Sequence, residues 1–187
     1  MMKFETNKTA VIVVDMLNDF VKEDGALVVP GASKLIPNQQ KVLKTAREQG
    51  VKVIYLTDNH LPDDDEFEKW PPHAVAGTEG AEVIDELKPN DRDRVIPKRR
   101  YSGFFGTDLD ITLREADIQT LVLMGVLTDI CVMYTSADAT AKDYDVVTVK
   151  DAVDSSNREN HEFAIQHMKS VHGATIATTD EVVKALK

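Results

Sequence analysis

The chain has 187 residues, of which 42% are hydrophobic and 29% charged, and this is enough for one domain with a hydrophobic core over residues 1–187. Its 22 basic and 32 acidic residues leave a formal net charge of −10, which argues against nucleic acid or an anionic membrane as a partner. A small neutral or cationic ligand suits this charge better. A single cysteine excludes an internal disulfide and any multi-cysteine zinc or iron–sulfur site. The first apolar run is too short for a secretion signal or a membrane span, so we expect a cytoplasmic protein.

Short apolar runs rich in β-branched residues alternate along the chain with segments of helical periodicity. We expect strands at 10–14, 51–57, 94–96, 121–124, 146–149 and 174–176, and helices at 33–49, 108–115, 131–142, 159–171 and 180–186. Apolar strands joined by helical crossovers favour an α/β fold, with a mostly parallel sheet between two layers of helices. Such sheets bind ligands at the carboxyl ends of their strands, so the residues that follow each strand are the candidates for function.

A carboxylate follows the first expected strand. Asp15 stands where a nucleotide-binding protein would have a glycine-rich turn, and the sequence contains neither a dinucleotide fingerprint nor a phosphate-binding loop. Asp15 is either the cap of the next turn or a functional group, and the residues around it leave both interpretations open.

Candidate metal ligands follow the second expected strand. Asp58 and His60 project to the same side because strand side chains alternate, and His73 lies on a proline-stiffened loop that could return to the same strand ends. One aspartate and two histidines suit zinc, iron or manganese and leave coordination positions open. The acidic run at 63–66 is expected to be a solvated loop for most of its members, while Glu66 is a candidate for a further oxygen ligand.

Lys98 and Cys131 follow the third and fourth expected strands. A lysine at the end of a strand can reach the shared crevice, although a solvated side chain is its ordinary role. Cys131 stands where a strand gives way to a helix, whose free N–H groups favour a thiolate and an oxyanion beside it. A lone cysteine is also a common small core residue, so the position alone does not decide its role.

These residues resemble the pattern of the isochorismatase-like cysteine hydrolase superfamily. The superfamily has an aspartate after strand one, a lysine after strand three and a cysteine in a G-V-x-T-[DE]-x-C-V turn, and Asp15, Lys98 and Cys131 fill these places in order. The chain is similar in particular to the nicotinamidase (pyrazinamidase) branch. That branch adds D-x-H, a W/F-P-x-H loop and K-x-x-Y-S-[AG]-F-x-G-T-D-L, and these motifs stand here at 58–60, 70–73 and 98–109.

The resemblance implies a six-stranded sheet with the Rossmann-like order 3-2-1-4-5-6 and an Asp15–Lys98–Cys131 triad. The implied activity is hydrolysis of nicotinamide to nicotinate and ammonia through a cysteine thioester. It also implies an oxyanion hole formed by the backbone N–H groups of Leu127 and Cys131, next to a cis peptide between Val126 and Leu127.

The same resemblance implies one divalent metal ion, with zinc as the first choice and iron or manganese as alternatives. The ligands would be Asp58, His60 and His73, and some nicotinamidases add a glutamate at the position of Glu66. In that branch the metal binds the pyridine nitrogen of the substrate. Three aromatic side chains would then wall the substrate ring: Phe20, Trp70 and Tyr101. Superfamily members are often oligomeric, so a homo-oligomer is a candidate state.

Two other interpretations stay open at this point. The chain could be a superfamily hydrolase that acts on a different small amide or on isochorismate, or a non-catalytic metal-binding or thiol protein on the same fold. If the triad is catalytic, we expect burial to raise the pKa of Asp15, and Lys98 and the helix end to lower that of Cys131. The remaining histidines, His161, His167 and His172, are expected to have surface or packing roles.

Overall fold

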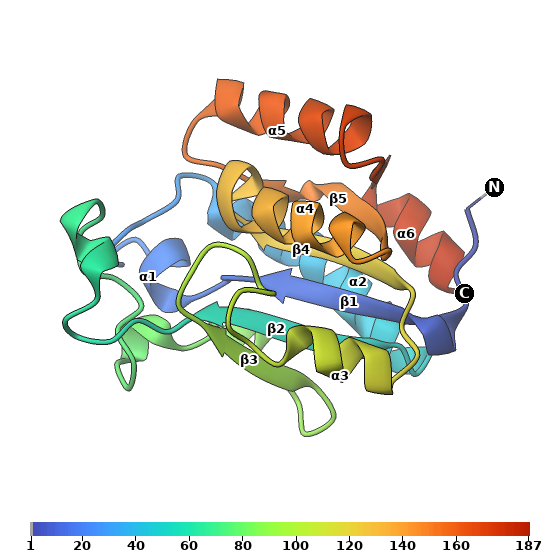
Figure 1. The fold of residues 1–187 in the computed structure, drawn as a ribbon, viewed down its shortest axis with the longest axis horizontal. Coiled ribbons are helices and arrows are strands. Elements are labelled where there is room, and N and C mark those ends of the chain that lie inside the picture. Colours follow the sequence, from blue (N-terminus) through green and yellow to red (C-terminus); the bar gives the residue numbers. More distant parts are fainter. Residues whose placement is uncertain (1) are drawn as a thin grey trace.

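The computed structural model describes residues 2–187 and forms a six-stranded sheet (Figure 1). The strands are β1 (Thr9–Val14), β2 (Lys52–Asp58), β3 (Arg94–Lys98), β4 (Thr120–Val126), β5 (Asp145–Asp154) and β6 (Thr175–Ala177). They lie in the order β3-β2-β1-β4-β5-β6, and every neighbouring pair is parallel. The predicted fold class and strand order are therefore confirmed.

Helices cover both faces of the sheet (Figure 1). They are α1 (Asn18–Val21), α2 (Ile36–Glu48), α3 (Leu109–Glu115), α4 (Met133–Ala141), α5 (Arg158–Ser170) and α6 (Thr179–Leu186). Apolar residues of α2 and α6 join one core cluster, and those of α3, α4 and α5 join the other. The result is the expected arrangement of three layers.

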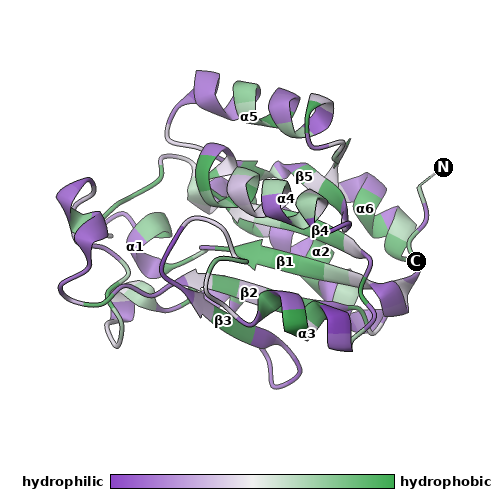
Figure 2. Ribbon diagram, in the orientation of Figure 1, coloured by the Kyte–Doolittle hydropathy of each residue, from purple (hydrophilic) through white to green (hydrophobic). Residues whose placement is uncertain are grey.

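Strand β1 explains why the sheet must be covered on both sides. All six of its residues are buried. Val11 and Val13 belong to the core on the α2 side, while Ile12 and Val14 belong to the core on the opposite side, because successive side chains point to opposite faces. Figure 2 shows the central strands as hydrophobic and the helices as a mixture of hydrophobic and hydrophilic residues.

The helix ends follow from local sequence signals. Asn157 caps α5 with its side chain, and Thr178 forms a capping box with Glu181 at the start of α6. Gly50 and Gly173, expected as helix stops, follow α2 and α5 with left-handed φ values of +70° each.

Two elements near the strand ends differ from the prediction. The short helix α1 was not expected, because four residues carry too little periodicity to be recognised. The helix expected at 131–142 is preceded by a π-helical turn, Thr128–Val132 (η6), and continues as α4. The Leu127 carbonyl accepts a hydrogen bond from the N–H of Val132, five residues on, at 3.1 Å. The helical segment therefore begins before Cys131.

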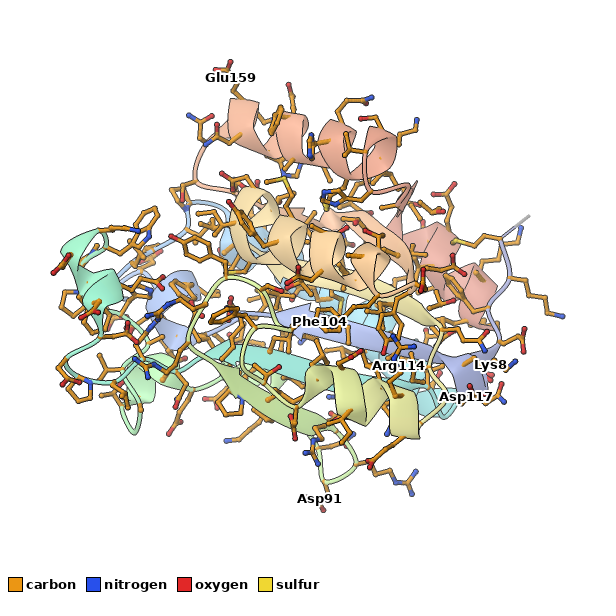
Figure 3. All side chains as sticks on the ribbon, in the orientation of Figure 1. Lys8, Asp91, Phe104, Arg114, Asp117 and Glu159 are labelled. Carbon is orange, nitrogen blue, oxygen red and sulfur yellow. The ribbon has the colours of Figure 1, made fainter. Side chains whose placement is uncertain are left out.

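The carboxyl ends of the strands point toward the left of Figure 1, where α1 lies. Lys8 and Asp117, labelled in Figure 3, precede β1 and β4 and mark the opposite end of the sheet. Within residues 2–187, no helix has both the length and the apolar character needed to cross a membrane.

Candidate active site

Asp15 lies directly after β1 and is fully enclosed by its neighbours. Its φ of +51° is in the left-handed region, which aspartate tolerates better than most residues. Its backbone N–H donates to the Leu56 carbonyl at 2.9 Å, and its Oδ1 accepts from the N–H of Asp58 at 2.7 Å. The end of β2 therefore fixes the position of the Asp15 carboxylate.

The turn that carries Cys131 begins with a close approach between strands β4 and β1. Gly125 has a φ of +123°, and a Cβ there would lie 2.0 Å from the Val14 carbonyl oxygen, so only glycine fits. The Val126–Leu127 peptide is cis, as the resemblance implied. The π-helical turn then places the buried Cys131 side chain beneath the strand ends.

Lys98, the last residue of β3, lies between the Asp15 carboxylate and the Cys131 thiol. Its Nζ lies 2.8 Å from Asp15 Oδ2 and 3.4 Å from Cys131 Sγ, and it also donates to the Asp58 carboxylate. Lys98, Asp15 and Cys131 are all buried. A buried ammonium group needs charged partners, and two carboxylates supply them here.

Burial and neighbouring charges shift the pKa values of these groups. Burial, together with the charge of Asp58, raises the pKa of Asp15 to about 6, in the direction expected from the sequence. Burial disfavours the charge of Lys98, but Asp15 and Asp58 outweigh it and hold the pKa of that lysine well above its usual value. Burial raises the pKa of the Cys131 thiol well above its usual value, and the opposing charge of Lys98 does not offset this. The expected lowering of the Cys131 pKa is therefore wrong, because desolvation of the thiolate is the larger effect.

Asp58, His60 and His73 bring ligand atoms within 4.8 Å of one another, and all three residues are buried. Burial opposes ionisation of Asp58, but the charge of Lys98 and the nearby His60 ring lower its pKa to about 2. His60 Nε2 is buried and has no hydrogen-bond partner. The Nδ1 of His73 pairs with the Pro71 carbonyl at 2.7 Å, which leaves its Nε2 as the free ring nitrogen. A divalent metal ion would satisfy the orphaned nitrogen, so this donor set fits zinc, iron or manganese.

Glu66 lies beside these three residues without joining them. It is buried and forms part of the pocket wall, and its Oε2 is 3.7 Å from a guanidinium nitrogen of Arg100. Its ligand atoms are not among those that converge in the Asp58–His60–His73 group. The role of Glu66 as a further metal ligand stays a prediction.

One pocket joins the candidate nucleophile to the candidate metal ligands, and its walls are mainly apolar. Its lining residues are Asp15, Phe20, Leu27, Val29, Asp58, Glu66, Trp70, His73, Tyr101, Val126, Leu127, Ile130, Cys131 and Ser156. The three aromatic residues expected to wall a substrate ring are thus all present. Trp70 Nε1 donates to the Tyr101 hydroxyl at 3.2 Å, which ties two of them together. Leu127, the second expected oxyanion donor, lies in the same wall as Cys131.

Two aspartates that the sequence did not single out hold the loops of this site. Asp19 accepts hydrogen bonds from the N–H groups of Ala26 and Ala74, at 3.1 and 2.8 Å, and so supports the residue that follows His73. Asp64 was expected to be solvated with the rest of the acidic run, but its side chain is fully buried. That expectation is wrong for Asp64, because its charge partners come from a segment distant in sequence.

The isochorismatase domain family matches residues 9–181. The chain is 37% identical over 183 residues to Bacillus subtilis PncA, described as an uncharacterized isochorismatase family protein, covering 91% of this chain and 99% of that one. It is 36% identical to a probable inactive nicotinamidase of Arabidopsis thaliana over 87% of this chain and 89% of the relative. It is also 34% identical to the ureidoacrylate amidohydrolase RutB of Agrobacterium fabrum, with 78% and 75% covered.

Solved structures of the same superfamily also resemble this chain. An isochorismatase-like hydrolase from Alkaliphilus metalliredigens has a TM-score of 0.92 and 38% identity, with 96% of this chain and 100% of that chain covered. An N-carbamoylsarcosine amidase from Thermoplasma acidophilum has a TM-score of 0.86 and 42% identity, with 92% and 97% covered. A pyrazinamidase of Pyrococcus horikoshii in complex with zinc has a TM-score of 0.86 and 34% identity, with 91% and 99% covered. The chain belongs to the isochorismatase family and is a hydrolase of the isochorismatase-like superfamily.

Proposed function

We propose that this chain is a metal-dependent amidohydrolase that converts nicotinamide and water to nicotinate and ammonia through a thioester on Cys131. The observation that carries the proposal is the meeting of two buried groups in one pocket. Asp15, Lys98 and Cys131 form one of them, and Asp58, with two histidines, forms the other. Lys98 contacts an aspartate of each group, so the two are one electrostatic unit.

The first half of the reaction forms the thioester. The Sγ proton of Cys131 passes to the Asp15 carboxylate, which is ionised near neutral pH because its pKa is about 6. The sulfur then bonds to the carboxamide carbon, and the carbonyl oxygen takes up negative charge. The backbone N–H groups of Leu127 and Cys131 donate to this oxygen. Loss of one such donor typically costs about 100- to 1000-fold in rate.

The second half returns the site to its starting state. The C–N bond breaks as Asp15 gives its proton to the leaving nitrogen, so that ammonia departs. Asp15 then takes a proton from water as the water oxygen attacks the thioester carbon. The C–S bond breaks, Asp15 returns its proton to the sulfur of Cys131, and the acid leaves as nicotinate after losing the other water proton to the solvent. The proton given to ammonia and the proton returned to the sulfur thus both pass through the Asp15 carboxylate.

Lys98 serves both halves by keeping its charge. Its Nζ is 2.8 Å from Asp15 and 3.4 Å from the sulfur. An ammonium group at these distances stabilises the thiolate when it forms and holds the carboxylate in place. Burial raises the pKa of the Cys131 thiol, so a base is needed to form the thiolate, and Asp15 is placed to act as that base.

One divalent metal ion would be held by Asp58, His60 and His73, with Glu66 as the candidate for a fourth ligand. Zinc is the first choice and iron or manganese are alternatives, and the zinc complex of the related pyrazinamidase supports this order. When bound, the metal supplies a Lewis-acidic position for the pyridine nitrogen, as the resemblance to nicotinamidases implies. Phe20, Trp70 and Tyr101 pack against the ring from the pocket wall.

The pocket wall favours an uncharged substrate. No lysine or arginine is among its lining residues within the part of the chain that the structure describes. Lys98 is close, but its charge is already shared between two carboxylates. A substrate that carries a carboxylate, such as ureidoacrylate, would meet no cationic side chain in the wall and would lie next to three acidic side chains, so the proposed metal ion alone would have to balance its charge. This supports nicotinamide over the substrates named for RutB and for N-carbamoylsarcosine amidase.

The test is a comparison of kcat/KM for ammonia release from nicotinamide, pyrazinamide, ureidoacrylate and N-carbamoylsarcosine by the zinc-loaded protein. We expect nicotinamide and pyrazinamide to be hydrolysed at least about 100-fold more efficiently than the two acids, because a buried carboxylate that pairs with no cationic side chain costs several kcal/mol. Preferred hydrolysis of either acid would contradict the proposed substrate class, and hydrolysis of none of the four would contradict the amidase itself.

A further inference from the structure

Asp64 is a buried carboxylate immediately behind one of the candidate metal ligands. In the acidic run at 63–66, Asp63 and Asp65 are exposed, whereas the side chain of Asp64 has no exposed area. Asp64 does not line the pocket, so it is not placed to touch a substrate. A buried ionised group is costly unless it is paired with other groups. The neighbours of Asp64 therefore indicate its role.

Each carboxylate oxygen of Asp64 has two polar neighbours. Oδ2 lies 3.3 Å from His60 Nδ1 and accepts from Arg99 at 2.9 Å. Oδ1 accepts from Arg100 at 3.0 Å and from the N–H of Glu66 at 3.1 Å. The pKa of Asp64 is lowered even though burial opposes this, because these donors favour the ionised form.

The contact with His60 decides which ring nitrogen faces the pocket. A carboxylate beside Nδ1 favours the proton on that nitrogen and leaves the lone pair on Nε2. That Nε2 is buried and unpartnered, and it lies 3.8 Å from Asp58 Oδ2. The ring is thus turned so that its free nitrogen points toward the other candidate ligands.

We propose that Asp64, held by Arg99 and Arg100, is a positioning residue that fixes the tautomer and the orientation of His60 for metal binding. The inference rests on the proposed metal site at Asp58, His60 and His73. The two arginines follow Lys98 directly, so the segment after β3 supports the metal side of the pocket as well as the nucleophile side. Removal of an outer carboxylate of this kind typically lowers metal affinity by about 10- to 100-fold.

The experiment compares the zinc dissociation constants of the wild-type protein, Asp64→Asn and Asp63→Asn, measured by competition with a chromogenic chelator. The two variants remove the same charge from neighbouring positions, one buried and one exposed. We expect Asp64→Asn to bind zinc about 10- to 100-fold more weakly and Asp63→Asn to bind as the wild type does. Equal weakening in both would reduce the effect to general electrostatics and overturn the inference, and so would unchanged binding in both.

A second readout needs no metal. Nitrogen NMR shifts of His60 in the metal-free protein report which ring nitrogen carries the proton. We expect the Nδ1–H form in the wild type and a mixture of both tautomers in Asp64→Asn. The same tautomer population in both would overturn the inference. If the wild type shows the Nδ1–H form and yet binds no zinc, it is the proposed metal site that fails, and the tautomer comparison still decides the role of Asp64.

A third variant covers the case in which Asp64→Asn does not fold. Arg99→Met keeps most of the side-chain volume at a half-exposed position and removes one donor from the carboxylate. We expect a smaller loss of zinc affinity, of a few-fold, together with a partial change in the His60 tautomer. No change in either quantity would contradict the proposed support of Asp64 by the arginine.

Discussion

At the scale of single residues, Gly125 shapes the start of the turn that carries Cys131, the candidate nucleophile. A side chain there would collide with the backbone of β1, because its Cβ position is 2.0 Å from the Val14 carbonyl oxygen. The backbone also has a φ of +123°, which residues with a side chain rarely adopt. Both effects act on the residue that precedes the cis peptide and the Cys131 turn.

We therefore expect Gly125→Ala to lower the free energy of unfolding by at least about 3 kcal/mol, since a backbone clash adds to an unfavourable φ. Urea unfolding followed by circular dichroism measures this. Gly77→Ala is the matched control, because Gly77 also has a positive φ, of +79°, but nothing lies within 4 Å of its Cβ position. We expect a cost of about 1 kcal/mol there. Equal costs in the two variants would contradict the close approach of the strands.

The sequence was sufficient to predict the candidate site residues that directly follow a strand. Asp15, Lys98 and Cys131 could be found because parallel strands bring their carboxyl ends together, and the structure does bring these three into contact. The burial of Asp64 could not be found, since an acidic run looks like a solvated loop until its arginine partners from another segment are known. The opposite pKa shift of Cys131 was missed for the same reason, because the depth of burial is a property of the fold.

At the scale of elements, the turn that carries Cys131 is held in place by polar contacts with α5 and with the residue that follows β5. Thr128 Oγ1 lies 2.9 Å from His161 Nδ1, and both residues are buried. The N–H of Asp129 donates to the Ser155 hydroxyl at 3.3 Å. His161 thus has a packing role, within the range expected from the sequence, and it packs specifically against the start of the π-helical turn.

This contact makes stability depend on pH. Burial lowers the pKa of His161 below its usual value, with Asp154 acting in the other direction. The unfolded state therefore binds a proton more readily than the folded state. The stabilising contribution of neutral His161 is complete above the unfolded pKa of about 6.5 and is lost as the pH falls through that value toward the lower folded pKa.

We expect the free energy of unfolding of the wild type to fall between pH 7.5 and pH 5 more steeply than that of His161→Gln, which cannot titrate. The difference between the two proteins, measured by urea unfolding at several pH values, isolates this histidine from the other titrating groups. A difference that stays constant across the range would contradict the role assigned to His161.

The regular elements were predicted from periodicity, and their ends shifted by a few residues in most cases. The π-helical turn at Thr128–Val132 was not predicted, because a hydrogen bond between residues five apart leaves no trace in a pattern read at 3.6 residues per turn. Helix α1 and the loops around it were missed because they are held by side chains such as Asp19, whose partners lie far along the chain.

At the scale of the whole molecule, the strand order explains why one pocket holds both chemical groups. β1 lies between β2 and β4, and β3 lies beyond β2, so four successive strand ends meet at one edge (Figure 1). The order reverses at β1, and ligands of doubly wound sheets bind at such a reversal. The fold and the meeting of these residues thus follow from the alternation of strands and helices, whereas the identity of the metal and of the substrate depends on side-chain geometry.

Metal binding should also stabilise the whole fold. A ligand that binds only the folded state adds about 4 kcal/mol at a concentration of 1,000 times its dissociation constant. We expect zinc to raise the melting temperature of the chelator-treated protein by several degrees and to have no such effect on His73→Ala, which lacks one candidate ligand. A similar rise in both proteins would place the zinc elsewhere.

The most direct measurement is ammonia release from nicotinamide under four conditions: the wild type and Cys131→Ala, each with zinc and after removal of zinc by a chelator. We expect release only from the zinc-loaded wild type, with activity restored when zinc is added back. Undiminished release by Cys131→Ala, or by the metal-free wild type, would contradict the proposal that both groups of the pocket act on one substrate. No release from a wild-type protein that binds zinc stoichiometrically would contradict the nicotinamidase activity itself.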